Sequence, residues 1–245
     1  MVFRMRYVGV DLAWGTRNMT GLAVLDESHT LVDLVEGRTD EQIEAWLRRW
    51  TDGPCLVAFD APLIVTNAGG SRACERLVGR HFGAYQASCY PSSLATPHFA
   101  DGGRAARLAK ALGLDTTLGS TQDRRAIEVY PHPAMIVLFG LSTVLRYKKR
   151  SRFDLRKVEL TRLVDLVETL DLRLGAQWAA IRTTVEEAQR QADLNRVEDR
   201  VDAVVCAYVA AYTQEKPDAV RHLGDHDGFI VTPVTPEMAS RIPGP

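Results

Sequence analysis

The alternation of apolar and polar positions in the first sixty residues predicts three strands, a helix and a fourth strand. Three short runs rich in β-branched and aromatic residues are joined by brief polar links, which is typical of an antiparallel meander; they cover residues 6–13, 20–25 and 30–35. A helix follows Thr39, its predicted cap, and places Ile43, Trp46 and Leu47 on one face. The wholly apolar run 55–59 indicates a buried parallel strand.

Beyond residue 60 the pattern becomes mainly helical. Helical spacing predicts helices over residues 71–82, 104–112, 153–170 and 176–191. Short apolar runs make residues 126–130 and 229–232 candidate strands. The stretch 84–101 is rich in Ser, Pro and Gly and indicates a loop. Residues 200–213 are apolar nearly all round, which predicts a helix buried against the sheet. We expect one α/β domain over residues 1–245, with loop and helical insertions at 71–125 and 150–195.

Composition narrows the class of protein. Hydrophobic residues make up 46% and charged residues 25% of the 245 residues, values that exclude intrinsic disorder and a fibrous fold. No apolar run is long enough to cross a membrane and no secretion signal is present, so we expect a cytoplasmic protein without a membrane partner. The four cysteines lack metal-site spacing, which favours reduced thiols over a zinc site or disulfides.

Charge is nearly balanced but unevenly placed. The net charge of −1 gives no strong global field, whereas the segment 146–157 carries seven basic residues and only one acidic residue. Such a segment predicts a phosphate-contacting surface for nucleic acid, with Tyr147 available for base stacking; its candidate basic contacts are Lys148, Lys149 and Arg150. The alternative is a solvated helix start, the commoner meaning of a charge run.

Two aspartates stand where apolar strands end. Asp11 closes the first strand, and Asp60 directly follows the run 55–59. If these strands are neighbours, both carboxylates emerge at one edge of the sheet, where ligands bind in open α/β folds. A divalent cation would relieve their mutual repulsion, and Mg²⁺ is the usual ion for oxygen ligands, with Mn²⁺ as a substitute. The alternative for each residue is a turn or cap aspartate.

Three further acids complete the candidate set. Asp199 and Asp202 share one face of the first turn of the last predicted helix, although Asp199 could instead be its N-cap. Glu128 lies inside an apolar run, and the alternative for it is an outward-facing position on an edge strand. A carboxylate cluster that holds two Mg²⁺ ions can activate water and stabilise the leaving oxygen in phosphodiester hydrolysis.

Other kinds of site have weaker support. The chain contains no dinucleotide fingerprint, Walker loop, zinc-protease motif or serine elbow. The turn over residues 11–16 favours, as an alternative, an ATP-dependent phosphotransferase of the actin and sugar-kinase type, but it lacks the usual glycine two residues after the acid. His132, between two prolines, is a candidate to orient water or a plain helix-start residue. A non-catalytic nucleic-acid-binding protein is the third hypothesis.

The order of these features resembles the ribonuclease H-like superfamily and, more closely, the predicted nucleases of domain-of-unknown-function family 429. The matching stretches span residues 8–203; they are Val8-Gly9-Val10-Asp11, Phe59-Asp60-Ala61-Pro62, Arg72-Ala73-Cys74-Glu75, Glu128-Val129-Tyr130-Pro131, Tyr147-Lys148-Lys149 and Asp199-Arg200-Val201-Asp202-Ala203. Each motif is short, and their order and spacing carry the specificity of the match.

The resemblance implies a ribonuclease H-like mixed five-stranded sheet, its first three strands antiparallel, flanked by helices and carrying a helical insertion in the C-terminal half. It implies a metal-dependent nuclease site with Asp11, Asp60 and Asp202 as metal ligands and Asp199 as their alternate. Glu128 matches a catalytic acid of the family pattern whose role is less defined, and Arg72 is an implied substrate contact. The long stretch from residue 71 to 191 departs from simpler members of the superfamily.

Overall fold

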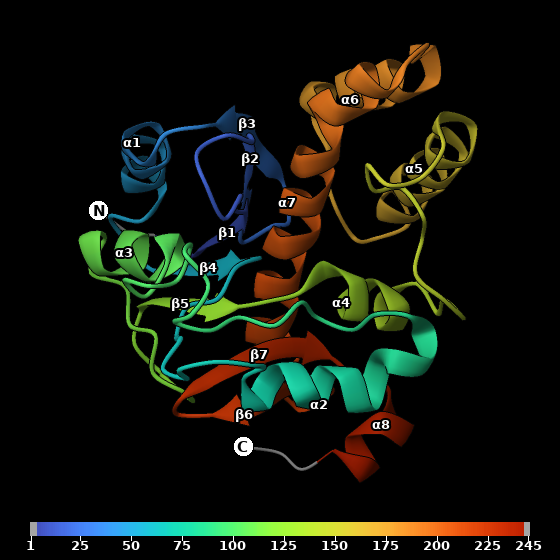
Figure 1. Ribbon diagram of the computed structural model, residues 1–245. Helices are drawn as coiled ribbons and strands as arrows, with labels where there is room; N and C mark the ends of the chain where they lie inside the picture. Colours follow the sequence, from blue (N-terminus) through green and yellow to red (C-terminus); the bar gives the residue numbers. More distant parts are fainter. Residues whose placement is uncertain (1–3, 243–245) are drawn as a thin grey trace.

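A mixed five-stranded sheet forms the centre of the protein, shown as a computed structural model that describes residues 4–242 (Figure 1). The strand order is β3-β2-β1-β4-β5, with β1, β2 and β3 antiparallel and β1, β4 and β5 parallel. The strands are β1 (Arg6–Asp11), β2 (Thr20–Asp26), β3 (Leu31–Gly37), β4 (Cys55–Phe59) and β5 (Arg124–Glu128). The predicted α/β architecture, with three antiparallel strands first, is confirmed.

Helices and a small second sheet surround this centre. The helices are α1 (Asp40–Trp50), α2 (Ala73–Phe82), α3 (Arg104–Ala111), α4 (Pro131–Leu138), α5 (Phe153–Val167), α6 (Gly175–Glu187), α7 (Gln191–Glu215) and α8 (Pro236–Arg241). Two 3-10 turns, η1 (Gly83–Tyr85) and η2 (Pro217–Ala219), and a hairpin of β6 (Val220–Asp225) and β7 (Gly228–Pro233) complete the fold. Within residues 4–242, no helix is both long and apolar enough to span a membrane.

Side chains alternate between the two faces of the sheet, and each face has its own helical cover (Figure 1). Val8, Val57 and Phe59 belong to a core shared with α1 and α3. Tyr7 and Ala58 belong to a second, larger core that contains α7, α2 and the β6–β7 hairpin. The direction of any strand residue can therefore be read from its register, which matters for the acids at the strand ends.

Helix α7 lies directly on β1 and β2 because both strands present glycine beneath it. A Cβ on Gly9 would lie 1.9 Å from the carbonyl oxygen of Ala203, and one on Gly21 would lie 1.9 Å from that of Asp199. Any larger residue at either position would force the helix away from the sheet. These two contacts bring the acidic part of α7 close to the end of β1.

Several element boundaries differ from the sequence prediction. Helix α7 begins at Gln191 rather than at residue 200, because Leu194 and Val197 extend its buried face. Helix α4 begins at Pro131, which occupies the first turn and needs no N–H partner, so the interpretation of His132 as a helix-start residue is confirmed. Strand β6 was not predicted. The Thr39 cap is confirmed, and Gln42 completes a capping box with it.

Candidate active site

Asp11 and Asp60 lie side by side where β1 and β4 end. Val10 pairs with Phe59 in the parallel ladder, and the Asp60 N–H donates to the Val10 carbonyl over 2.8 Å. Asp11 follows the alternation of Tyr7 and Gly9, and Asp60 that of Ala58, so both carboxylates belong to the sheet face covered by α7. The expectation that these strands are neighbours and end at one edge is confirmed.

Helix α7 contributes acids from its middle rather than from its start. The N-cap of α7 is Arg190, so the alternative that Asp199 caps this helix is wrong. Asp202 is completely buried, and Glu198, one turn earlier, is nearly so. Sequence reasoning missed Glu198, although its i, i+4 spacing from Asp202 on an apolar helix was a usable signal.

A lysine from a distant loop binds these two acids. The Lys148 ammonium donates to Asp202 Oδ2 and lies 3.3 Å from Glu198 Oε1. The Tyr147 hydroxyl donates to the other oxygen of Asp202, Oδ1, over 2.8 Å. Burial alone would lower the pKa of Lys148, but the surrounding negative charge, Asp202 foremost, raises that pKa well above its usual value. The lysine is therefore held as a cation among the carboxylates.

One lysine does not neutralise the whole cluster. Burial raises the pKa of Asp11 well above its usual range, with Lys148 opposing the shift and Asp202 and Asp60 adding to it. Burial likewise raises the pKa of Asp60 to about 7 and that of Asp199 to about 6, again against the Lys148 charge. These carboxyl groups have raised pKa values because they are poorly solvated and share one nearby ammonium, and a further cation would lower those pKa values.

The donor set fits a divalent cation in chemistry but is not preassembled. Asp11 Oδ2 is buried without a hydrogen-bond partner, as expected of an oxygen that lacks its ligand. Across residues 4–242, however, no three His, Cys, Asp or Glu side chains converge tightly enough to hold a metal ion. Asp11, Asp60 and Asp202 would be the residues to hold one, with Asp199 beside them, after a local rearrangement.

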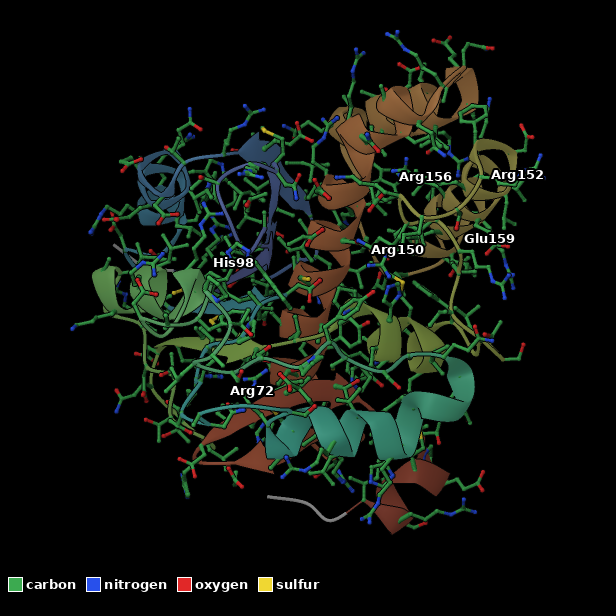
Figure 2. All side chains as sticks on the ribbon, viewed as in Figure 1. Arg72, His98, Arg150, Arg152, Arg156 and Glu159 are labelled. Carbon is green, nitrogen blue, oxygen red and sulfur yellow. The ribbon has the colours of Figure 1, made fainter. Side chains whose placement is uncertain are left out.

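Arg156 of α5, labelled in Figure 2, links the loop that carries Lys148 to α7. Its guanidinium is fully buried and donates to the Tyr147 carbonyl over 2.8 Å, to Asn195 Oδ1 over 2.8 Å and to Glu198. Glu198 thus binds both Arg156 and Lys148. This arrangement holds the backbone next to Lys148 while leaving the lysine side chain 38% exposed.

Only part of the basic segment 146–157 is exposed on the surface. Tyr147 is fully buried beneath Lys148, so the expectation that it stacks on bases is wrong, and Arg156 is buried as well. Lys149 and Arg150 are exposed, and Arg150 donates to the hydroxyl of Tyr90 over 2.8 Å. Tyr90 is 61% exposed and is the accessible aromatic residue beside this segment, which sequence reasoning missed.

Glu128 and Arg72 form a buried ion pair next to Asp60. Glu128 pairs in register with Phe59 and lines the same small cavity as Asp60, and its charge adds to the raised pKa of Asp60. Both of its oxygens accept from Arg72, over 2.8 and 2.5 Å, and Glu75 binds the same guanidinium. The side chains of Arg72 and Glu128 are at most 5% exposed, so neither offers a free group to a substrate.

A small cavity of about 70 Å³ lies beside Asp60. Trp14, Tyr90 and Tyr130 are among its lining residues, so aromatic side chains border the acid on this side. Cys89 also lines the cavity, but burial raises the pKa of its thiol far above the usual range, which leaves little thiolate for nucleophilic attack. His132 is a half-buried residue of α4, and loss of solvation lowers its pKa to about 3.

The turn after β1 is held by Arg104 of α3 and by Thr20 of β2. Arg104 donates to the carbonyls of Ala13 and Gly15 over 2.7 and 3.1 Å, and the Ala13 N–H donates to Thr20 Oγ1 over 3.2 Å. A phosphate-binding turn needs free backbone N–H groups directed at the ligand. Of the bonds seen here, that of Ala13 occupies a backbone N–H, whereas those of Arg104 hold the carbonyl groups of the turn.

Comparison with known families gives one match. Searches of curated proteins and of solved structures find no match to the chain. The model of the family described as "protein of unknown function (DUF429)" matches residues 9–227, a range that includes all five strands of the sheet except the start of β1 and every acid of the cluster. The chain belongs to the DUF429 family.

Proposed function

We propose that the protein is a metal-dependent nuclease that hydrolyses phosphodiester bonds on a ribonuclease H-like fold. The observation that carries the proposal is the meeting of Asp11, Asp60 and the α7 acids at the carboxyl ends of two parallel strands. The unpartnered Oδ2 of Asp11 and the raised carboxyl pKa values at this edge support a cation-binding role for these acids. The strand order β3-β2-β1-β4-β5 supports the fold assignment.

Mg²⁺, or Mn²⁺ in its place, would activate water and stabilise the charge on the leaving oxygen. Asp11 and Asp60 would bind the metal from the sheet, and Asp202, with Asp199 as its alternate, from α7. The close contacts of Gly9 and Gly21 with α7 set the distance between the acids of the sheet and those of the helix. Arg156 positions Lys148 and Tyr147 next to Asp202.

The expected partner is nucleic acid. Lys149 and Arg150 are exposed beside the cluster and can contact phosphates without desolvating a buried pair. Tyr90, bound to Arg150 and lining the cavity next to Asp60, supplies an aromatic face for a base. These residues replace Tyr147 and Arg72 in the proposed substrate surface.

Cleavage of a fluorescent panel of single-stranded, duplex and branched DNA and RNA tests the proposal. Activity should require Mg²⁺ or Mn²⁺, disappear with EDTA and fall at least about 100-fold in Asp11→Asn, the loss expected when a catalytic metal site is broken. Asp154→Asn, an exposed change of the same charge on α5, is the matched control and should retain activity.

Two other outcomes would redirect the assignment. Nucleic-acid binding that survives EDTA, without cleavage of any substrate, would favour a non-catalytic binding protein on this fold. A rise in melting temperature specific to ATP and Mg²⁺, again without cleavage, would favour a phosphotransferase. Either result would contradict the nuclease proposal.

A further inference from the structure

We propose that Lys148 is the resident cation of the carboxylate cluster and that a divalent cation binds there only when the lysine leaves Asp202. This inference rests on the proposed metal site and adds to it a residue of the chain that competes for the same ligands. It assigns Lys148 a role different from that of an exposed phosphate contact.

The contacts of Asp202 provide the first argument. Both carboxylate oxygens already accept a hydrogen bond, Oδ1 from Tyr147 and Oδ2 from Lys148. An ammonium bound to a carboxylate repels a second cation at the same oxygen, and poor solvation strengthens that repulsion. A metal ligated by Asp202 together with Asp11 therefore requires the ammonium to move.

The positive charge of Lys148 acts on acids of both α7 and the sheet. The ammonium contacts α7 through Asp202 and Glu198, and its charge also acts on Asp11 and Asp60 at the strand ends. It is thus the positive group that the two sides of the cluster share. A divalent cation placed between the same carboxylates would stabilise their ionised forms in the same way, with twice the charge.

The side chain of Lys148 also has access to solvent. Its side chain is 38% exposed, whereas the Asp202 that it binds is fully buried. Arg156 continues to neutralise Glu198 and to hold the Tyr147 carbonyl whether or not Lys148 stays. The ammonium can therefore move to solvent without loss of the contacts that fix its loop, and the exchange needs only rotation of one flexible side chain.

Mn²⁺ titration by calorimetry of the wild type, Lys148→Met and Lys149→Met tests the exchange. Methionine keeps the apolar length of the side chain without the charge, and the exposed neighbour Lys149 controls for loss of one positive charge near the cluster. Lys148→Met should bind Mn²⁺ at least about tenfold more tightly than the wild type, and Lys149→Met within about twofold. Equal or weaker binding by Lys148→Met would overturn the proposal and leave Lys148 a structural ion pair.

Thermal unfolding gives a second readout. In EDTA, Lys148→Met should melt below the wild type, because Asp202 loses its counter-ion, and Mn²⁺ should raise its melting temperature more than that of the wild type. Should this variant fail to fold, amine labelling of the wild type, read by mass spectrometry, replaces it. Mn²⁺ should then increase labelling of Lys148 relative to Lys149; an unchanged ratio at saturating metal would contradict the exchange.

The two proposals fail in different ways. Metal-dependent cleavage by the wild type combined with unchanged Mn²⁺ affinity in Lys148→Met refutes the exchange and leaves the nuclease assignment intact. Tighter Mn²⁺ binding by Lys148→Met without cleavage of any substrate supports the exchange and refutes the nuclease assignment. Absence of Mn²⁺ binding in both proteins refutes both.

Discussion

Gly9 of β1 and Ala203 of α7 are so close that a Cβ on Gly9 would lie 1.9 Å from the Ala203 carbonyl oxygen. This contact joins the strand that carries Asp11 to the helix that carries Asp202. The absence of a side chain at position 9 therefore sets the width of the candidate active site as well as the packing of the core.

Gly9→Ala should lower the free energy of unfolding by about 3 kcal/mol or more, because backbone atoms of α7 must shift to admit the methyl group. Urea unfolding measures the change. Gly69→Ala is the matched control, since no atom lies within 4 Å of its added Cβ. A loss at Gly9 no larger than that at Gly69 would mean that α7 is not held against β1 as described.

Replacement of Glu128 by Gln should lower the free energy of unfolding by about 1–3 kcal/mol, because the buried Arg72 guanidinium loses one of its two carboxylate partners and keeps Glu75. Chemical denaturation measures the loss. Asp11→Asn should show no comparable loss in metal-free buffer, since Asp11 Oδ2 has no partner to lose. If Glu128→Gln were as stable as the wild type but inactive, Glu128 would belong to the catalytic set after all.

Stability without metal should depend on pH through Asp60. Its pKa is about 7 in the folded protein against 3.8 for the free side chain, so the folded state holds more protons between these values. This contribution to the free energy of unfolding therefore falls as pH rises from about 4 to about 7 and stays low above that range.

Asp60→Asn removes the titrating group and should stabilise the protein in EDTA at pH 8, by on the order of 2 kcal/mol, with the gain vanishing near pH 4. Urea unfolding at pH 4, 6 and 8 measures the difference from the wild type. Asp154→Asn, exposed on α5, controls for loss of one negative charge. A gain that is independent of pH would show that Asp60 is ionised without penalty in the folded state.

Arg156→Lys should lower stability by about 3 kcal/mol even though the positive charge is kept. A lysine has one nitrogen and cannot donate at once to the Tyr147 carbonyl, Asn195 and Glu198, as the guanidinium does. Thermal and urea unfolding measure the loss. Arg152→Lys, at an exposed position just before α5, should have little effect; equal effects would argue against Arg156 as the anchor of the loop.

The sheet and its two acids could be predicted because their signals are local. The apolar runs that end at Asp11 and Asp60 indicate buried strands, and a crossover helix between them favours parallel neighbours. The burial of Arg156 also had a local signal, since it shares the helical stripe of Leu160 and Leu163, but its place in a run of basic residues obscured it.

The contacts of Lys148 could not be predicted in the same way. Its partners lie on α7, far along the chain, and only the tertiary packing of the loop after α4 brings them together. The same packing buries Tyr147 and leaves Tyr90 exposed, a distinction that composition alone does not make. The ion pair of Glu128 could not be predicted either, because its partner Arg72 lies 56 residues earlier in the chain.

A crystal soaked in Mn²⁺ shows whether the carboxylate cluster binds a metal, because anomalous scattering locates the ion without reference to activity. We expect an anomalous peak within about 2.0–2.4 Å of carboxylate oxygens of Asp11, Asp60 and Asp202, with Lys148 moved away from Asp202. A crystal at millimolar Mn²⁺ with no peak at this edge of the sheet, and with Lys148 still bound to Asp202, would contradict this expectation.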